Sequence, residues 1–334
     1  MLFAHISDCH IGGWKEDKLK EINLECFRKA IYEIVERKVD FLLISGDLFN
    51  TALPQIDYIK ETTSELKKLK DLGIPVYMIA GSHDFSPSGK TMLEVLEKAG
   101  LIINVMQFEN NILKFTLDEK TNAKITGMIG KKGGLEINDY EVLNKEPLEK
   151  EEGFKIFMFH TAIEEFKPKG CEEMHGAGVA MLPNNFNYYA GGHVHYIFQK
   201  EFGKGVLTFP GALFPNNFKE MEDYPYGGVY FVDENSKFEF LPIKIKEILS
   251  FEIDVRGFSP EKATQKIIEV VKSKDLKDKI VTLRVYGEID GKTADVNFKE
   301  VFEVMNEAYY VLKNTAKLQS KKSGEIAMKL GTVE

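Results

Sequence analysis

The stretch Leu2-Phe3-Ala4-His5-Ile6-Ser7-Asp8-Cys9-His10 opens the chain with a short apolar run that ends in a carboxylate and an imidazole. Four later runs also end in polar motifs. Hydrophobicity that is continuous rather than alternating predicts strands covered on both faces. Polar residues that follow such strands meet at one edge of an α/β sheet. The five motifs are Asp8-Cys9-His10, Gly46-Asp47, Gly81-Ser82-His83-Asp84, His160 and Gly192-His193-Val194-His195.

These motifs contain five of the seven histidines of the chain, together with several aspartates. Carboxylate oxygen and imidazole nitrogen are the ligands that Mn²⁺, Fe or Zn ions take in proteins. Helical patterns at about residues 18–37 and 54–72 separate the first three runs, which predicts a βαβαβ start. The pattern therefore predicts an α/β fold that carries two divalent metal ions.

The five motifs, in this order from residue 3 to about residue 215, resemble the calcineurin-like metallophosphoesterase superfamily. Within it, residues 3–12 and 45–49 are most similar to the SbcD-type double-strand-break repair nucleases. The resemblance implies a metallophosphoesterase sandwich, in which mixed β-sheets are flanked by helices. It also implies a small α+β capping domain at the C-terminal end.

The resemblance implies a role for each motif residue. His83 would stabilise the transition state or protonate the leaving oxygen, and Asp84 would orient His83. Asp47 would bridge the two ions, because a carboxylate has two oxygens to share. Asn50 and Gly211 would contact substrate, although a purely structural turn at Gly211 is an equal alternative. The remaining metal ligands would be Asp8, His10 and His195 for the first ion, and Ser82, His160 and His193 for the second.

Two positions depart from the family pattern. Relatives usually carry asparagine where this chain has Ser82, and a hydroxyl is a shorter and weaker ligand than an amide oxygen. We therefore expect the second ion to bind more weakly than the first. Many relatives carry histidine at the position of Asn50, so a helper histidine is missing here.

Three segments are expected along the chain: a nuclease domain at residues 1–245, a capping domain at 250–315 and a polar tail at 316–334. A strand–helix–strand–helix order in the second segment is the pattern that resembles a cap. Ser259 is expected to cap the first of these helices, with Pro260 at its first position. Ordinary phosphatases of the superfamily lack such a cap, so it favours the nuclease.

Composition is consistent with a cytoplasmic protein that does not enter the membrane. The chain has 334 residues, of which 43% are hydrophobic and 29% charged, and no apolar run long enough to span a membrane is present. The three cysteines show neither paired nor metal spacing, and the chain enters its first strand too early to carry a signal peptide.

A net charge of −8 argues against a DNA-coating protein but not against a nuclease, because phosphate contacts can come from a local patch. Candidates are Lys131-Lys132 beside Gly133-Gly134, and Lys167 with Lys169. His175 could overhang the site from a long loop. Solvated loops are the alternative for all of them.

The sequence thus predicts a nuclease that hydrolyses phosphodiester bonds of DNA through two-metal activation of water, with Mn²⁺ as the expected metal. The resemblance implies exonuclease action from 3′ ends, endonuclease action on single strands, and a role in double-strand-break repair. It also implies a homodimer, formed by helices at about residues 54–72 and 89–99, and an SMC-like ATPase partner. A small-molecule phosphodiesterase or phosphatase is one alternative, and a catalytically weak protein that binds DNA ends is another.

Overall fold

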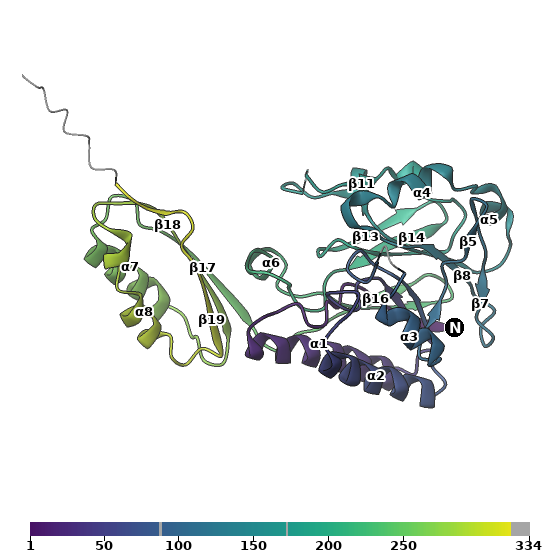
Figure 1. Ribbon diagram of the computed structural model, residues 1–334, viewed down its shortest axis with the longest axis horizontal. Helices are drawn as coiled ribbons and strands as arrows, with labels where there is room; N and C mark the ends of the chain where they lie inside the picture. The colour runs from purple at the N-terminus through teal and green to yellow at the C-terminus, as the bar shows by residue number, and fades with distance from the viewer. Residues whose placement is uncertain (87–88, 172, 322–334) are drawn as a thin grey trace, which may run out of the picture. The chain divides into compact units, whose positions relative to one another are not determined.

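The computed structural model describes residues 1–86, 89–171 and 173–321 (Figure 1). The chain divides into two compact units, Met1–Ile245 and Lys246–Glu334. The first unit contains two six-stranded mixed sheets with helices beside them, which confirms the predicted metallophosphoesterase sandwich. No helix in the described part of the chain is long and apolar enough to cross a membrane.

The first sheet has the strand order β16-β15-β1-β2-β3-β4. The strands β1, β2, β3 and β4 run parallel, the first three as the βαβαβ pattern predicted, and β15 and β16 add an antiparallel edge. The strands are β1 (Leu2–Ile6), β2 (Phe41–Ser45), β3 (Val76–Ile79), β4 (Ile103–Asn104), β15 (Gly228–Asp233) and β16 (Phe238–Pro242).

The second sheet has the order β13-β14-β12-β9-β8-β7. Four parallel strands lie between two antiparallel edges, and the parallel direction brings the ends of β9 and β12 to the same side. The strands are β7 (Thr116–Leu117), β8 (Lys124–Met128), β9 (Lys155–His160), β12 (Tyr188–Gly192), β13 (Ile197–Phe202) and β14 (Gly205–Pro210).

Aromatic and branched side chains from both sheets form one core between them. Phe3 stacks on Phe41 with ring centroids 5.0 Å apart, and Tyr188 from the second sheet meets Phe3 edge-on at 5.2 Å. Strand residues are therefore buried on both faces, which explains their unbroken hydrophobicity. This core fixes the two sheets against each other and hence the motifs at their edges.

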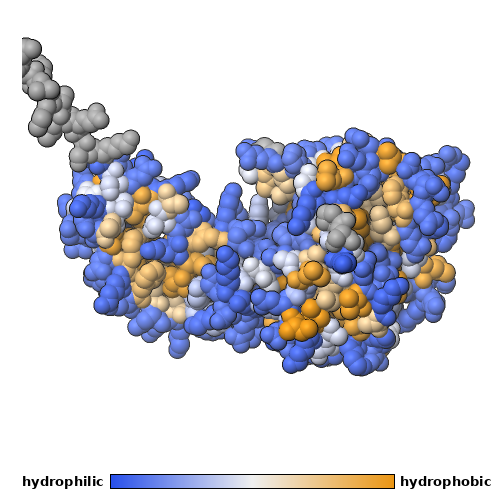
Figure 2. All heavy atoms as spheres, viewed as in Figure 1, coloured by the Kyte–Doolittle hydropathy of each residue, from blue (hydrophilic) through white to orange (hydrophobic). Residues whose placement is uncertain are grey.

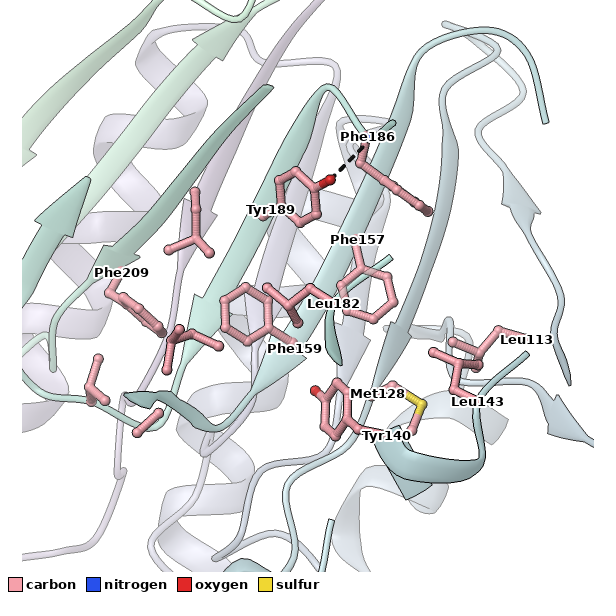
Figure 3. Close-up of a cluster of buried hydrophobic side chains, with 14 of the residues drawn as sticks. Leu113, Met128, Tyr140, Leu143, Phe157, Phe159, Leu182, Phe186, Tyr189 and Phe209 are labelled. Carbon is pink, nitrogen blue, oxygen red and sulfur yellow. Dashed lines mark hydrogen bonds between the residues drawn. The ribbon is translucent and has the colours of Figure 1, made fainter. Parts of the chain in front are cut away.

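Helices complete the layers of the first unit. The helices α1 (Asp17–Glu36) and α2 (Ile56–Asp71) lie side by side along one flank (Figure 1), and α1 buries an apolar stripe at helical spacing. On the second sheet, a cluster around Phe157, Phe159 and Tyr140 packs under short helices (Figure 3). The shorter helices are α3 (Met92–Lys98), α4 (Ile137–Val142), α5 (Glu146–Lys150) and α6 (Phe218–Asp223).

Short elements occupy the connections. Two-stranded ladders join β5 (Phe108–Glu109) to β6 (Ile112–Leu113) and β10 (Ala162–Ile163) to β11 (Gly176–Ala177). Single 3₁₀ turns lie at Lys132–Gly134, Glu164–Phe166, Val179–Met181 and Thr293–Asp295.

The second unit is a small α+β fold around its own core. Ser259 Oγ accepts from Lys262 N at 3.3 Å and Pro260 begins the helix, as predicted. Residues 316–334 were expected to form a polar tail, but Leu318–Ser320 form a strand, β20, that pairs with β18 (Ile280–Ile289). Residues 322–334 lie outside the described part. The other elements are β17 (Ile248–Asp254), α7 (Pro260–Lys272), β18 (Ile280–Ile289), α8 (Phe298–Val304) and β19 (Tyr310–Asn314).

Candidate metal centre

The five motifs converge where the strands of both sheets end. Among the described residues, three groups of potential ligands have their donor atoms within 4.8 Å of one another. Neighbouring groups share members, so the groups form one cluster rather than three separate sites. They are Asp8 with His10 and His195, His10 with Asp47 and His83, and Asp8 with Asp47 and His160.

Two histidine nitrogens lie close enough together to share one metal ion. His10 Nε2 and His195 Nε2 lie 3.0 Å apart, and both lie near Asp8 Oδ1, at 4.0 and 3.8 Å. Two nitrogens that bind one ion at about 2.1 Å and at right angles are separated by about 3.0 Å. The spacing therefore fits a shared ion as the resemblance implied.

His195 is held from behind by Glu220 on α6. Nδ1 of His195 donates to Glu220 Oε2 at 2.7 Å, and the same oxygen accepts from Asn216 N at 2.8 Å. Burial opposes both charges, yet the contact raises the pKa of His195 and lowers the pKa of Glu220. With Nδ1 occupied, Nε2 is left available to a metal ion, the arrangement found in metal sites whose histidines are oriented by a carboxylate.

Sequence reasoning missed Glu220. A signal was present, because Asn217 and Glu220 are spaced as a helix cap and its third residue. Asn217 Oδ1 does accept from Glu220 N, at 3.0 Å. The pattern predicts the start of α6, but it contains nothing that identifies His195 as a partner of the side chain.

The second group centres on Asp47 and His160. Nδ1 of the buried His160 donates to Ser45 O at 2.8 Å, and its Nε2 lies 3.2 Å from Asp47 Oδ2 without a hydrogen-bond partner in the described structure. Burial acts to lower the pKa of His160, but the Asp47 and Asp8 carboxylates outweigh it and raise that pKa to about 10. Ser82 Oγ lies 3.4 Å from Asp47 Oδ2.

His193 lies beside this group rather than inside it. Its ring centroid is 5.2 Å from that of His160, and burial lowers its pKa to about 3. Its backbone N–H donates to both carboxylate oxygens of Asp8, at 3.0 and 3.1 Å. The backbone of His193 therefore helps to hold Asp8 of the first group. Its ring lies next to His160 of the second group.

The expected contact between Asp84 and His83 is wrong. Asp84 is buried and accepts from the backbone of Leu48, Phe49 and Gly81, at 3.1 to 3.2 Å. Burial and the nearby Asp47 raise its pKa to about 7. Asp84 therefore ties the loop after β2 to the loop after β3, because three amides need an acceptor there.

The carbonyl of Asn50 orients His83 instead. His83 Nδ1 lies 2.9 Å from Asn50 O, while the Asn50 side-chain oxygen accepts from Asn216 at 3.1 Å. Gly211, expected to touch substrate, is buried with φ 73°, and a Cβ there would lie 2.9 Å from His195 O. The structure thus places Gly211 in a tight turn behind His195, and its contact with substrate remains a prediction.

Two features of the structure, which do not depend on the family resemblance, indicate that these residues fit two divalent ions. Asp8, His10, Asp47 and His193 all have positive φ, between 43° and 87°. Such backbone costs on the order of 1–3 kcal/mol per residue and gathers at functional sites. The unpartnered nitrogen of the buried His160 points to a missing partner of the kind a metal supplies.

Glycines allow this close approach. A Cβ at Gly46 would lie 2.2 Å from His160 Nδ1, and one at Gly81 would lie 2.2 Å from Asp47 Oδ1. No side chain fits at either position, so the backbone itself packs directly against His160 and Asp47.

Comparison with known proteins agrees with the geometry. Residues 1–196 match the calcineurin-like phosphoesterase family. The DNA double-strand break repair protein Mre11 of Methanocaldococcus jannaschii is 31% identical over 272 residues, which cover 77% of this chain and 68% of that protein. Proteins of the same name from Methanococcus maripaludis and Thermoplasma acidophilum are 29% and 27% identical, over 78% and 86% of this chain and 69% and 78% of their own lengths. The predicted resemblance is confirmed: the chain belongs to the calcineurin-like phosphoesterase family, in the branch that includes the archaeal Mre11 proteins.

Proposed function

We propose that this protein is a metal-dependent DNA nuclease that hydrolyses phosphodiester bonds with two divalent ions, most simply Mn²⁺. The observation that carries the proposal is the shared membership of the ligand groups. Asp8, His10 and Asp47 each belong to two of them, which is the arrangement two adjacent ions need. The names of the relatives supply DNA as the substrate and double-strand-break repair as the setting.

Each ligand has a proposed place. Asp8, His10 and His195 would hold the first ion, and Asp47 would be shared with the second. His160 and His193 would hold the second ion, with Ser82 beside it. When bound, two such ions would supply positive charge to a phosphate and lower the pKa of a bound water. Fe and Zn suit the same donors, so availability would decide the metal in the cell.

The chain's own groups position the reaction. The Asn50 carbonyl accepts from His83 Nδ1–H, which leaves Nε2 for the substrate. His83 would therefore act as an imidazolium that donates its Nε2 proton to the leaving oxygen and becomes neutral. Glu220 holds His195 in the tautomer that keeps Nε2 free. Asp84 fixes the two loops that carry Asp47 and His83.

Exonuclease action from 3′ ends and endonuclease action on single strands are proposed by relationship, as are a capping role for the second unit and an SMC-like ATPase partner. A homodimer is supported by exposed apolar side chains at α2 and α3, where orange atoms gather in Figure 2. Ile56, Leu72 and Val95 are 77%, 59% and 55% exposed. A monomeric mass in sedimentation would count against it.

The test is to incubate the protein with Mn²⁺ and labelled single- and double-stranded DNA, beside a small phosphodiester, with Asp8→Ala as the control. We expect cleavage of DNA that disappears in the variant. Cleavage of the small ester alone would make the protein a phosphodiesterase. Binding of DNA with no cleavage of either substrate would make it a DNA-end-binding protein, with Ser82 and Asn50 as the cause.

A further inference from the structure

We propose that a pocket beside the metal centre binds the nucleic-acid strand next to the phosphodiester that is cut, with Lys132 and His175 contacting its phosphate. The inference deepens the proposed function and rests on it in one respect: the metal centre is taken as the place of the cut. The pocket has a volume of about 390 Å³, within the usual range for small-ligand sites.

One wall of the pocket belongs to the metal centre. Ser82, His83 and His193 line it, so a ligand there would lie against the proposed acid and the second ion position. The remaining lining residues come from two loops that the proposed chemistry does not use. They contribute Lys132 and His175, both exposed at their side chains.

Both loops are anchored to the turn that follows the ligand His160. Glu136 accepts from Thr161 Oγ1 at 2.9 Å and from Lys131 N at 3.1 Å, which fixes the base of the first loop. Ala162 pairs with Gly176, which fixes the second loop. The pocket wall therefore has a defined position relative to the ions.

The two loops also meet each other. Gly134 has φ 74°, and a Cβ there would lie 3.1 Å from His175 Cβ. A larger residue would push the loops apart, so this glycine lets His175 approach the Lys132 loop. The loops thus form one continuous wall rather than two separate surface turns.

The charges at the pocket indicate which ligand fits. Two of the described residues that line the pocket are lysines, and Lys131 is already paired with Asp139 at 2.5 Å, so Lys132 is the one left for an anion. Glu173 also lines the pocket and opposes an anion. A phosphodiester carries one negative charge, so one lysine with an imidazole suits it, and the exposed position suits a strand that continues in both directions.

A small phosphodiester has no neighbouring phosphate and would not reach this wall. The inference therefore favours a polynucleotide over a small ester as substrate. Lys132 and Glu173 both line the pocket and carry opposite charges, so we expect opposite effects on strand binding. Loss of Lys132 should weaken it, and loss of the Glu173 charge should strengthen it.

The test measures binding of a short fluorescent single-stranded oligonucleotide in EDTA, by anisotropy at several salt concentrations. Lys132→Ala should weaken binding on the order of five-fold and reduce the slope of log affinity against log salt by about 0.7, the value for one single-strand phosphate contact. Glu173→Gln should tighten binding. The matched control is Lys204→Ala, since Lys204 is an exposed lysine just before β14, at the opposite end of the second sheet.

Equal effects of Lys132→Ala and Lys204→Ala, an unchanged slope for Lys132→Ala, or no binding by the unaltered protein would each overturn the inference. Cleavage with Mn²⁺ is scored separately. A protein that cleaves DNA but shows no Lys132 effect retains its proposed function and loses this pocket. A protein that shows the Lys132 effect but cleaves nothing retains the pocket and loses the nuclease.

Discussion

Glu220 Oε2 lies 2.7 Å from His195 Nδ1, so a short helix that caps itself with Asn217 also orients a proposed metal ligand. Loss of the carboxylate should weaken the first ion. Partners of ligating histidines typically contribute ten- to a hundred-fold to metal affinity. We expect Glu220→Ala to lower Mn²⁺ affinity by about that range, and Glu220→Gln, which keeps an acceptor, to lower it less.

Isothermal titration with Mn²⁺ measures this effect directly. Asp223→Asn, which changes an exposed carboxylate on the same helix, is the control and should leave the titration unchanged. Equal behaviour of the Glu220 and Asp223 variants would show that the contact does not position His195.

His83 should separate catalysis from metal binding. Its removal as His83→Ala is expected to lower kcat on the order of 10²- to 10⁴-fold, as loss of a general acid does. The Mn²⁺ content per chain, measured by elemental analysis after dialysis, should remain the same. Because His83 also lies within a ligand group with His10 and Asp47, a parallel fall in metal content would make it a ligand instead.

Ser82 should limit the second ion. Its hydroxyl lies 3.4 Å from Asp47 Oδ2, and an amide would extend further toward the ion position. Ser82→Asn is therefore expected to raise occupancy of the second ion at limiting Mn²⁺, and Ser82→Ala to leave it as low as in the natural chain or lower. A titration that is the same for all three proteins would remove Ser82 as the cause of weak binding.

Asp84 should contribute more to the stability of the fold than to the orientation of His83. It is the acceptor for the backbone N–H groups of Leu48, Phe49 and Gly81, and a buried donor without a partner costs about 1–3 kcal/mol. Urea unfolding of Asp84→Ala should show a loss of at least that size. Full stability with reduced turnover would instead support a direct role in orienting His83.

Acid should destabilise the protein through His5. This residue is buried between the sheets, with Nδ1 3.0 Å from Tyr188 Oη, and burial lowers its pKa from 6.5 to about 3. Between these values the unfolded chain binds a proton that the folded chain does not. The contribution of neutral His5 to the free energy of unfolding is therefore complete above pH 6.5 and falls as the pH approaches 3. At pH 4 the loss is about 3 kcal/mol.

The difference between the natural chain and His5→Gln isolates this contribution from those of the other histidines. Unfolding by urea in EDTA should show the smaller pH dependence in the variant. A pH dependence of the same size in both proteins would mean that His5 is not held neutral.

The sequence was sufficient for the strands that carry the motifs, because those strands are buried. The unbroken runs that lead into Gly46-Asp47 and into His160 became β2 and β9, and the helical pattern near residues 18–37 became α1. Weakly patterned pieces were not predictable: β20 was expected to be a polar tail, and its pairing with β18 is a tertiary contact that three residues cannot encode.

The metal centre was predictable as a set of residues but not as a set of contacts. Motif order identified Asp47 and His160, whose atoms do meet. The partners of Asp84 and His195 were missed for the same reason: they come from loops and from α6, whose approach depends on the whole fold. Gly211 was ambiguous from the sequence; its buried turn supports the structural alternative, and a contact with substrate stays a prediction.

Anomalous diffraction at the manganese edge, from crystals grown with Mn²⁺, would locate the ions of the proposed nuclease. We expect two adjacent peaks, one held by Asp8, His10 and His195, the other by His160 and His193, with Asp47 between them. A single peak, or a peak ligated by His83, would refute the two-ion site.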